Sequence, residues 1–471
     1  MGTDPVFLTS EIRRIEQAAG DVSPSLMERA GSAAADFSIE LVSERSKDVL
    51  VLAGPGNNGG DARIAAARLQ EKFFRVTVVS QPRELPLDRS WGLVIDGLFG
   101  IGLARNVTGD YAQLVEYANR QRCPVLALDV PSGIQSDTGQ VLGCAVRATH
   151  TLTFIGLKPG LLTLDGPDHS GEVRVASLGV DLSRSKPNAW VAGPGLFKDS
   201  LKPRPRNFHK GMAGSVGILG GARGMTGAAL LAGRAALKLG AGRVYVGLLN
   251  EDSPVDYGAP ELMLRHADDV LGMDLDAAVA GPGLGSTEHA ATLVGAVLAS
   301  DMPCVLDADA LNLMADDRNL LEACARRTAD TLLTPHPAEA GRLLALTTAG
   351  VQADRLGAAR ALAQRYNAHV VLKGNGSVLV ARDGHLFINP TGNPGMASAG
   401  MGDVLSGILG ALLAQRYSGE SALVLGVHLH GAAADALAAS GSGPVGLTAG
   451  EAIESARKLW NAWLYGAHEA R

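Results

Sequence analysis

The chain has 471 residues, a formal net charge of −6, 59 glycines and a hydrophobic share of 46%, whereas only 4% of its residues are aromatic. This length is enough for two or three domains with sizeable cores, and the charge gives no reason to expect nucleic acid as a partner. The glycines gather in short loops after apolar runs, which argues against a collagen-like or disordered chain.

Short segments rich in Val, Leu and Ile alternate with longer Ala- and Leu-rich helical patterns. This alternation predicts βαβ units and mostly parallel sheets, and therefore an α/β fold. In the first half we expect helices over 12–19 and 26–30. The expected strands of this half span 49–53, 76–80, 93–96, 125–129, 151–155 and 173–177.

In the second half the expected strands span 215–219, 243–248, 277–280, 304–307, 331–334, 369–373 and 378–381. Between the two sets of strands, residues 181–206 show no clear hydrophobic periodicity and contain four prolines. We place a domain boundary there, near residue 188, which gives domains 1–187 and 188–471. The glycine loops of the two halves differ, so we expect a fusion of unlike domains and not a duplication.

The four cysteines are isolated, so we expect buried, reduced thiols and neither disulfides nor a zinc site. No signal-peptide pattern opens the chain, and no run of about 20 apolar residues occurs in it. We expect a soluble, cytoplasmic protein that binds neither nucleic acid nor membrane.

The predicted strand at 49–53 runs into Gly54-Pro55-Gly56-Asn57-Asn58-Gly59-Gly60-Asp61, ahead of a helical pattern over 62–69. A glycine-rich turn between a strand and a helix leaves N–H groups free for an anion. The two Asn and the Asp add side-chain recognition and oxygen donors. An N-cap role for Asp61 is the alternative.

Two further strands end in polar residues, at Asp96 and at Asp129, which is followed closely by Ser132. Taken singly, either Asp is more often a turn-forming residue than a ligand. Three polar strand ends in one sheet favour a shared site at its carboxyl edge. Oxygen ligands without Cys or His suit an alkali or alkaline-earth cation.

These residues, with Leu26–Gly31, resemble the YjeF N-terminal family, the NAD(P)H-hydrate epimerases, over roughly residues 7–180. The resemblance implies a Rossmann-like, three-layer αβα domain that holds potassium on Asn58, Asp96 and Ser132. It implies substrate contacts from Asn57, Asn58, Gly59, Gly60, Asp61, Gly100, Ile101, Gly102, Leu103, Ala104, Arg105, Asn106 and Asp129. The chain departs from the family pattern at Ala62, where glycine is common, and at Ile101, where threonine is common.

In the second half, residues 389–403 carry four glycines and lead into an apolar helix over 404–414. Small residues here let successive N–H groups point at the helix start, which suits a phosphoryl group. Asp403 is expected in the first helical turn, beside that phosphate. The alternative is a capped, buried helix with a flexible entrance.

Other polar residues of this half follow predicted strands. Lys373–Ser377 forms a turn between two strands that can face a nucleotide, although Gly-Asn-Gly is also an ordinary hairpin sequence. His336 lies between two prolines at a strand end, where we expect a ligand contact, with a purely structural histidine as the alternative. Residues 281–285 and 307–311 add two more polar strand ends.

Together these motifs resemble the YjeF C-terminal family, the ADP/ATP-dependent NAD(P)H-hydrate dehydratases, over about residues 195–465. The resemblance implies a ribokinase-like, three-layer αβα domain that uses ADP with magnesium. It implies substrate contacts at Ala228, Gly285, His336 and Asp403, with Asp403 as the catalytic base. It implies nucleotide contacts at Lys373, Gly374, Asn375, Gly376, Ser377, Asn393, Pro394, Gly395, Met396, Ala397, Ser398, Ala399, Gly400, Met401 and Gly402.

The implied function is repair of hydrated NADH and NADPH. The first domain would interconvert R- and S-NAD(P)HX, and the second would dehydrate the S form at the expense of ADP, giving AMP and phosphate. The alternatives are a small-molecule or vitamin kinase with a regulatory first domain, or a non-catalytic nucleotide sensor. We also expect a homo-oligomer, since Gly-rich α/β proteins often assemble.

Overall fold

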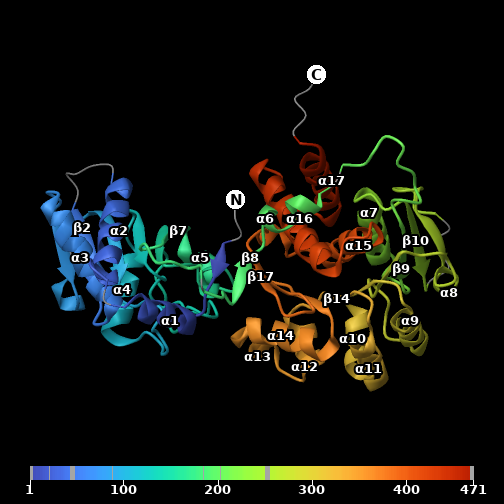
Figure 1. Ribbon diagram of the computed structural model, residues 1–471, viewed down its shortest axis with the longest axis horizontal. Helices are drawn as coiled ribbons and strands as arrows, with labels where there is room; N and C mark the ends of the chain where they lie inside the picture. Colours follow the sequence, from blue (N-terminus) through green and yellow to red (C-terminus); the bar gives the residue numbers. More distant parts are fainter. Residues whose placement is uncertain are drawn as a thin grey trace. The chain divides into compact units, whose positions relative to one another are not determined.

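The computed structural model describes residues 4–20, 22–42, 48–86, 89–183, 185–201, 203–249 and 255–466. The chain forms two compact units, Asp4–Val191 and Ala192–Arg471, coloured blue to green and green to red in Figure 1. The structural division thus falls four residues after the end of the predicted first domain.

The first unit is built on a parallel sheet with the strand order β3-β2-β4-β5-β6-β7. Its strands are β2 (Asp48–Ala53), β3 (Val76–Val79), β4 (Trp91–Gly97), β5 (Val125–Leu128), β6 (His150–Phe154) and β7 (Glu172–Ala176). Each matches a predicted strand to within two residues.

Helices cover both faces of this sheet. They are α1 (Thr9–Ala19), α2 (Leu26–Leu41), α3 (Asn57–Glu71), α4 (Gly109–Asn119) and the short α5 (Gly166–Ser170). Alternate side chains of β2 face opposite ways: Val49 and Val51 pack with α2 and α3, whereas Leu50 and Leu52 pack with α4. The expected three-layer αβα arrangement is confirmed.

A small antiparallel pair, β1 (Pro5–Val6) with β8 (Ala189–Val191), joins the two ends of the first unit. The predicted boundary near residue 188 lies just before β8, so a cut there would separate β8 from β1. Strand β8, with three residues, is too short to show a hydrophobic periodicity, so none was evident over residues 181–206.

The second unit has a longer sheet with the order β17-β16-β15-β14-β13-β12-β9-β10-β11. These strands are β9 (Ser215–Gly220), β10 (Arg243–Leu248), β11 (Met263–His266), β12 (Ala277–Ala280), β13 (Cys304–Leu306), β14 (Thr331–Leu333), β15 (His369–Leu372), β16 (Ser377–Val380) and β17 (Leu386–Asn389). All neighbours pair in parallel except β15 with β16 and β16 with β17. Among these strands, β11 and β17 have no counterpart in the prediction.

Two helical layers enclose this sheet (Figure 1). One layer contains α7 (Thr226–Lys238), α15 (Met401–Ala414), α16 (Gly419–Ala439) and α17 (Ala449–Tyr465), beside the short α6 (Pro194–Phe197). The other contains α8 (Ala267–Val270), α9 (Glu288–Ala299), α10 (Asp309–Asp316), α11 (Arg318–Arg326), α12 (Pro337–Leu344), α13 (Thr348–Ala353) and α14 (Arg355–Tyr366).

Helix α16 is long and apolar enough to cross a membrane by length and composition alone. However, 67% of its most apolar window is buried inside the protein. Burial of this kind is typical of a core helix.

Candidate active sites

In the first unit, α3 begins directly after the loop that follows β2. Gly56 is the N-cap, and the first intrahelical bond runs from Gly60 N–H to Gly56 C=O at 3.1 Å. Residues 57–61 therefore lie in the first turns of the helix, and the prediction that they form a loop ahead of it is wrong. The N–H groups of the first turn remain at the helix start, as an anion site requires. Asp61 lies beyond that first turn, which excludes its N-cap role.

Close packing explains two small residues of this segment. A Cβ on Gly59 would lie 1.9 Å from the Gly54 carbonyl oxygen, so the helix start can approach the loop only with glycine there. Ala62 is buried, and a Cβ on Gly97 would lie 2.4 Å from the Ala62 methyl group. The alanine that departs from the family pattern is therefore accommodated by a glycine opposite it.

Asp96 and Ser132 are brought together at the ends of β4 and β5. The Ser132 hydroxyl donates to Asp96 Oδ1 at 2.6 Å, and the Ser132 N–H donates to Asp96 Oδ2 at 2.8 Å. Burial raises the pKa of Asp96 to about 6, against the lowering effect of these bonds. Three predicted polar strand ends thus meet at one edge of the sheet, since Asn58, in the first turn of α3, lies against Gly97 and Gly100.

The Asn58 side chain is buried, and neither its oxygen nor its nitrogen has a hydrogen-bond partner within the described chain. A buried amide without partners is costly unless a ligand satisfies it. Together with the oxygens of Asp96 and Ser132, it offers the hard donor set that an alkali cation prefers. The residues present therefore fit a potassium ion.

Asp129 follows β5 and adopts a left-handed backbone conformation with φ of 66°. Its carboxylate forms an ion pair with Lys158, whose Nζ lies 2.5 Å from Asp129 Oδ1. A Cβ on Gly100 would lie 3.2 Å from Asp129 Oδ2 and 3.4 Å from Asn58 Cγ, so these three predicted residues are neighbours. Burial, and then the nearby carboxylates of Asp129 and Glu16, raise the pKa of Asp61 to about 8.

The remaining predicted substrate contacts of this unit are dispersed. Leu103 is buried in the core beneath α4, and Ile101 packs at the edge of a small apolar cluster around Phe7 and Ile12. Gly102 and residues 104–106 are exposed. A groove of about 670 Å³ lies elsewhere, between α1, the start of α2 and residues 179–181 and 185–186, and its lining includes none of the predicted site residues.

In the second unit, α15 starts where predicted, within the glycine-rich segment. Gly400 is the N-cap with φ of 89°, a conformation that favours glycine. The first intrahelical bond runs from Val404 N–H to Gly400 C=O. The N–H groups of residues 401–403 therefore precede the bonded helix, and Asp403 lies in the first turn as expected.

Asp403 is half-buried and close to other carboxylates. Burial, and then Asp307 and Asp309, raise its pKa to about 6, although the cation of Lys373 opposes this. A carboxylate with this pKa is largely ionised near neutral pH and can still accept a proton, as a general base must.

Lys373 is held beside Asp403 by a buried aspartate. Lys373 Nζ lies 3.0 Å from Asp307 Oδ1, and the Ser406 hydroxyl donates to Asp307 Oδ2 at 2.7 Å. A Cβ on Gly402 would lie 3.3 Å from Lys373 Nζ. The hairpin lysine and the helix start, predicted from separate motifs, thus form one site.

Two buried or partly buried side chains shape the predicted nucleotide loops. The Arg355 guanidinium donates to the carbonyl oxygens of Leu372 and Gly376 at 3.3 and 3.4 Å, which ties both ends of the β15–β16 turn to α14. Asp435 accepts from the Gly392 N–H at 2.9 Å and from the Asn393 side chain at 3.0 Å. The turn between β15 and β16 is confirmed as a hairpin.

Gly283, two residues before Gly285, lies next to Ala228, since a Cβ on Gly283 would be 3.2 Å from the Ala228 methyl group. The Gly285 N–H donates to Asp309 Oδ2 at 2.8 Å. Asp309 also raises the pKa of Asp403, so the residue that binds Gly285 lies in the electrostatic surroundings of the predicted base.

His336 serves a structural role that its sequence context left open. It is the N-cap of α12, where Nδ1 accepts from the N–H groups of Ala338 and Glu339, and Nε2 lies 3.2 Å from Glu339 Oε1. Both ring nitrogens are thus engaged by the helix cap, while the side chain remains 47% exposed. A substrate contact by His336 stays a prediction.

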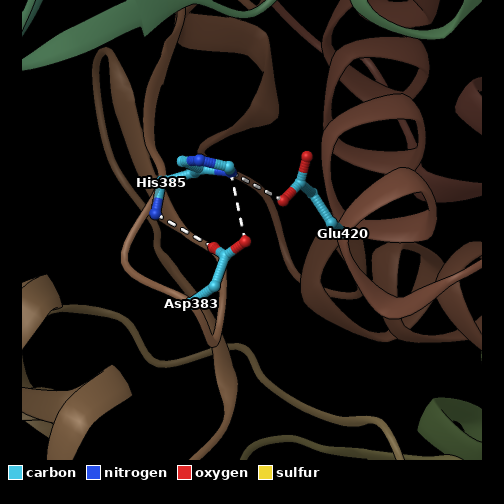
Figure 2. Close-up of side chains that lie close together, drawn as sticks. All are labelled: Asp383, His385 and Glu420. Carbon is cyan, nitrogen blue, oxygen red and sulfur yellow. Dashed lines mark hydrogen bonds and ion pairs between the residues drawn. The ribbon is translucent and has the colours of Figure 1, made fainter. Parts of the chain in front are cut away.

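Figure 2 shows a separate surface cluster in which His385 lies between Asp383 and Glu420. His385 Nδ1 lies 3.2 Å from Asp383 Oδ2 and 3.3 Å from Glu420 Oε2. Carboxylates and an imidazole can ligate a metal ion, but the aspartate and the histidine are exposed and the mutual ion pairs already account for the grouping.

Sequence reasoning placed Asp307 in a polar strand end but assigned it no contact, and it gave no role to Lys158 or Asp435. Lys158 and Asp307 follow strands of their sheets, at the same edge as the residues that were selected. The position of each after an apolar strand was therefore a usable indication. Asp435 lies inside α16 and carries no such indication.

Comparisons with known proteins match both units. A family model for NAD(P)H-hydrate dehydratase matches residues 216–456, and one for the YjeF-related protein N-terminus matches residues 23–92 and 87–160. The bifunctional NAD(P)H-hydrate repair enzyme of Escherichia coli is 37% identical over 97% of this chain and 94% of its own length. That of Coxiella burnetii is 38% identical over 96% of this chain and 98% of its own length.

Among solved structures, the ADP/ATP-dependent NAD(P)H-hydrate dehydratase from Bacillus subtilis, co-crystallized with ATP and Mg²⁺, is similar at 30% identity and a TM-score of 0.51. The match covers 58% of this chain and 98% of that protein. A ribokinase-like protein from Enterococcus faecalis, at 24% identity and a TM-score of 0.51 over 57% of this chain and 95% of its own, shares the fold.

Proposed function

Because the chain belongs to the family of bifunctional NAD(P)H-hydrate repair enzymes, we propose that it epimerises R- and S-NAD(P)HX and dehydrates the S form with ADP. The products are NAD(P)H, AMP and phosphate. We assign epimerisation to residues 1–187 and dehydration to residues 188–471. The observation that carries this proposal is the presence of two separate polar sites, each at the strand ends of its own αβα unit.

For dehydration, Asp403 takes the proton of the hydrate hydroxyl as that oxygen bonds to the β-phosphorus of ADP and AMP departs. Loss of phosphate from this carbon and of a proton from the neighbouring ring carbon then restores the ring double bond. Phosphate makes this elimination possible because it is a far better leaving group than hydroxide. The N–H groups of residues 401–403 and the Lys373 ammonium lie where charge on the phosphoryl group develops. The Bacillus subtilis structure with ATP and Mg²⁺ supports magnesium as the partner of the nucleotide phosphates.

For epimerisation, Asn58, Asp96 and Ser132 would hold potassium, which supplies a fixed positive charge beside an anionic substrate. The unpartnered Asn58 amide and the oxygen donors around it support this assignment. The first turn of α3 and Gly100 would contact the substrate, next to Asp129 and the protonated Asp61.

We propose that the protein acts in the cytoplasm as a homo-oligomer. The four free cysteines support a reducing compartment. Sedimentation of the purified chain tests the assembly.

The test is an assay of the full chain with a mixture of R- and S-NADHX, ADP, magnesium and potassium. We expect NADH to form from both epimers with one AMP released per NADH. Without ADP, the R and S forms should equilibrate and no NADH should appear. ADP consumption without the hydrate, or phosphorylation of a vitamin that leaves NADHX unchanged, would refute the proposal in favour of a kinase.

A further inference from the structure

The Lys158 ammonium is buried in the first unit, and its side chain is 0% exposed. Its Nζ has three close acceptors: Asp129 Oδ1 at 2.5 Å, Thr153 Oγ1 at 2.8 Å and the Phe154 carbonyl oxygen at 2.7 Å. An ammonium has three hydrogens, so these acceptors use its full donor capacity. Lys158 therefore has no donor left for a ligand and can act only through its neighbours.

The described hydrogen bonds to the Asp129 side chain all end on one of its two carboxylate oxygens, Oδ1. Lys158 Nζ donates to Oδ1, and longer contacts at 3.4 Å from the Thr153 hydroxyl and the Phe154 N–H end on the same oxygen. The other oxygen, Oδ2, lies on the side of Gly100 and Asn58. The left-handed backbone at Asp129 sets this orientation, and Lys158 fixes it at the side-chain end.

Other charged groups surround this carboxylate. Asp61 from α3 and Glu16 from α1 both have pKa values raised by burial and then by neighbouring carboxylates, Asp129 among them, while Lys158 and Arg13 oppose the shift at Glu16. Among the described hydrogen bonds, the Lys158 ammonium is bonded to the carboxylate of Asp129 and not to those of Asp61 or Glu16.

We propose that Lys158 is a positioning residue of the epimerase site, which holds the Asp129 carboxylate with Oδ2 free to exchange a proton with the hydroxyl of the hydrated nicotinamide ring. This inference rests on the proposed function. The two epimers differ at the carbon that carries this hydroxyl. When Oδ2 takes the hydroxyl proton, the oxygen forms a carbonyl as the bond between that carbon and the ring nitrogen breaks, and the nitrogen keeps the electron pair. Attack of the ring nitrogen on the other face of the carbonyl re-forms this bond, and the oxygen regains the proton from Asp129. No proton, electron pair or co-reactant is gained or lost overall.

The test is a double-variant cycle in the full chain, with Lys158→Met, Asp129→Asn and the two combined. R-to-S conversion is followed without ADP, and the spontaneous rate is subtracted. We expect Lys158→Met to lower kcat about 10- to 100-fold, as loss of a positioning partner does, and to change KM less than about threefold. Because Lys158 acts through Asp129, adding Lys158→Met to Asp129→Asn should reduce kcat no further.

The chain supplies its own controls. ADP-dependent dehydration of S-NADHX by each variant reports an intact second unit. Arg174→Met removes another cation paired with carboxylates in the first unit, but an exposed one, and should leave epimerisation unchanged. Thermal unfolding shows whether each variant is folded, and the combined variant should fold because neither charge is left buried alone.

Should Lys158→Met unfold the first unit, Thr153→Val is the second variant, since it removes one acceptor of Nζ and keeps both charges. It should lower kcat several-fold with KM unchanged. The inference is overturned by a folded Lys158→Met or Thr153→Val with wild-type kcat, or by effects of Lys158→Met and Asp129→Asn that multiply. Absence of epimerisation in the wild-type chain would instead refute the proposed function.

Discussion

Each unit pairs a lysine with an aspartate at the strand ends of its sheet, but the two lysines differ in access. Lys158 is 0% exposed and donates all three of its ammonium hydrogens to acceptors inside the first unit. Lys373 is 23% exposed and lies beside the glycine-rich start of α15. The same kind of ion pair is thus closed to ligands in one unit, where we propose that it positions a carboxylate, and partly open in the other, where we propose that its cation meets a phosphate.

The two units also differ in the pKa of a carboxyl group in each site, Asp61 in the first unit and Asp403 in the second. Burial and neighbouring carboxylates raise the pKa of Asp61 to about 8, so it is mostly protonated at neutral pH. The Lys373 cation opposes the same effects at Asp403, whose pKa is about 6. A protonated acid beside an ionised carboxylate suits reversible proton exchange, whereas an ionised base beside a cation suits attack on a phosphoryl group.

The largest effect is expected from Asp403→Asn, because this residue is the carboxylate in the first turn of α15. Dehydration of S-NADHX should fall about 10²- to 10⁴-fold, the usual contribution of a general base, while epimerisation is unchanged. NADH formation with ADP measures the first activity and R-to-S conversion the second. Dehydration within about twofold of wild type would remove Asp403 from this role.

Asn58→Ala and Asp96→Ala should affect only the other unit. We expect each to lower epimerisation about 10- to 100-fold and to weaken its dependence on potassium, as loss of metal ligands or their partners does. Titration with potassium against a sodium control measures this. A normal rate with a normal potassium response would show that the cation site is elsewhere.

Asp307→Asn sharpens the comparison of the lysines. Without its partner, the Lys373 ammonium loses the contact that holds it at the nucleotide site, so KM for ADP should rise about tenfold. Steady-state dehydration at varied ADP measures this change. Asp383→Asn, in the surface cluster of Figure 2, is a matched control that should leave KM unchanged. An unaltered KM in Asp307→Asn would mean that Lys373 does not contact the nucleotide.

The last prediction concerns stability and not activity. The folded-state pKa of Asp61, about 8, lies above its ordinary value of 3.8. Between these values the unfolded chain ionises Asp61 and the folded chain does not, so the wild type loses up to about 1.4 kcal/mol of stability per pH unit as pH rises. Asp61→Asn removes this loss. Its melting temperature should exceed that of wild type by more at pH 8 than at pH 5, and an equal difference at both would contradict the raised pKa.

The comparison also shows what the sequence could predict. Strands such as β2 and β9 are continuous apolar runs that end in glycine or polar residues, so their positions and the site edge were readable. The start of α3 was not, because four of the five residues at 57–61 are Asn or Gly, which have low helix propensity. The tertiary packing of Gly59 against Gly54 determines where α3 starts.

Side-chain partners were the least predictable part. Nothing local indicates that Lys158 pairs with Asp129, or Lys373 with Asp307, because each pair joins the ends of different strands. His336 was selected for its position at a strand end, yet its ring is used by the cap of α12. Position along a strand thus predicts which residues gather, and only the fold determines which of them bond.

The Arg355 guanidinium, which ties both ends of the β15–β16 hairpin to α14, has a consequence for the thermodynamics of nucleotide binding. The hairpin that carries Lys373 is held in place by bonds to the Leu372 and Gly376 carbonyl oxygens before any nucleotide arrives. Little conformational entropy is then lost in ordering this loop on binding. The enthalpy and entropy of ADP binding should therefore reflect phosphate desolvation and contact, with no signature of coupled folding at this hairpin.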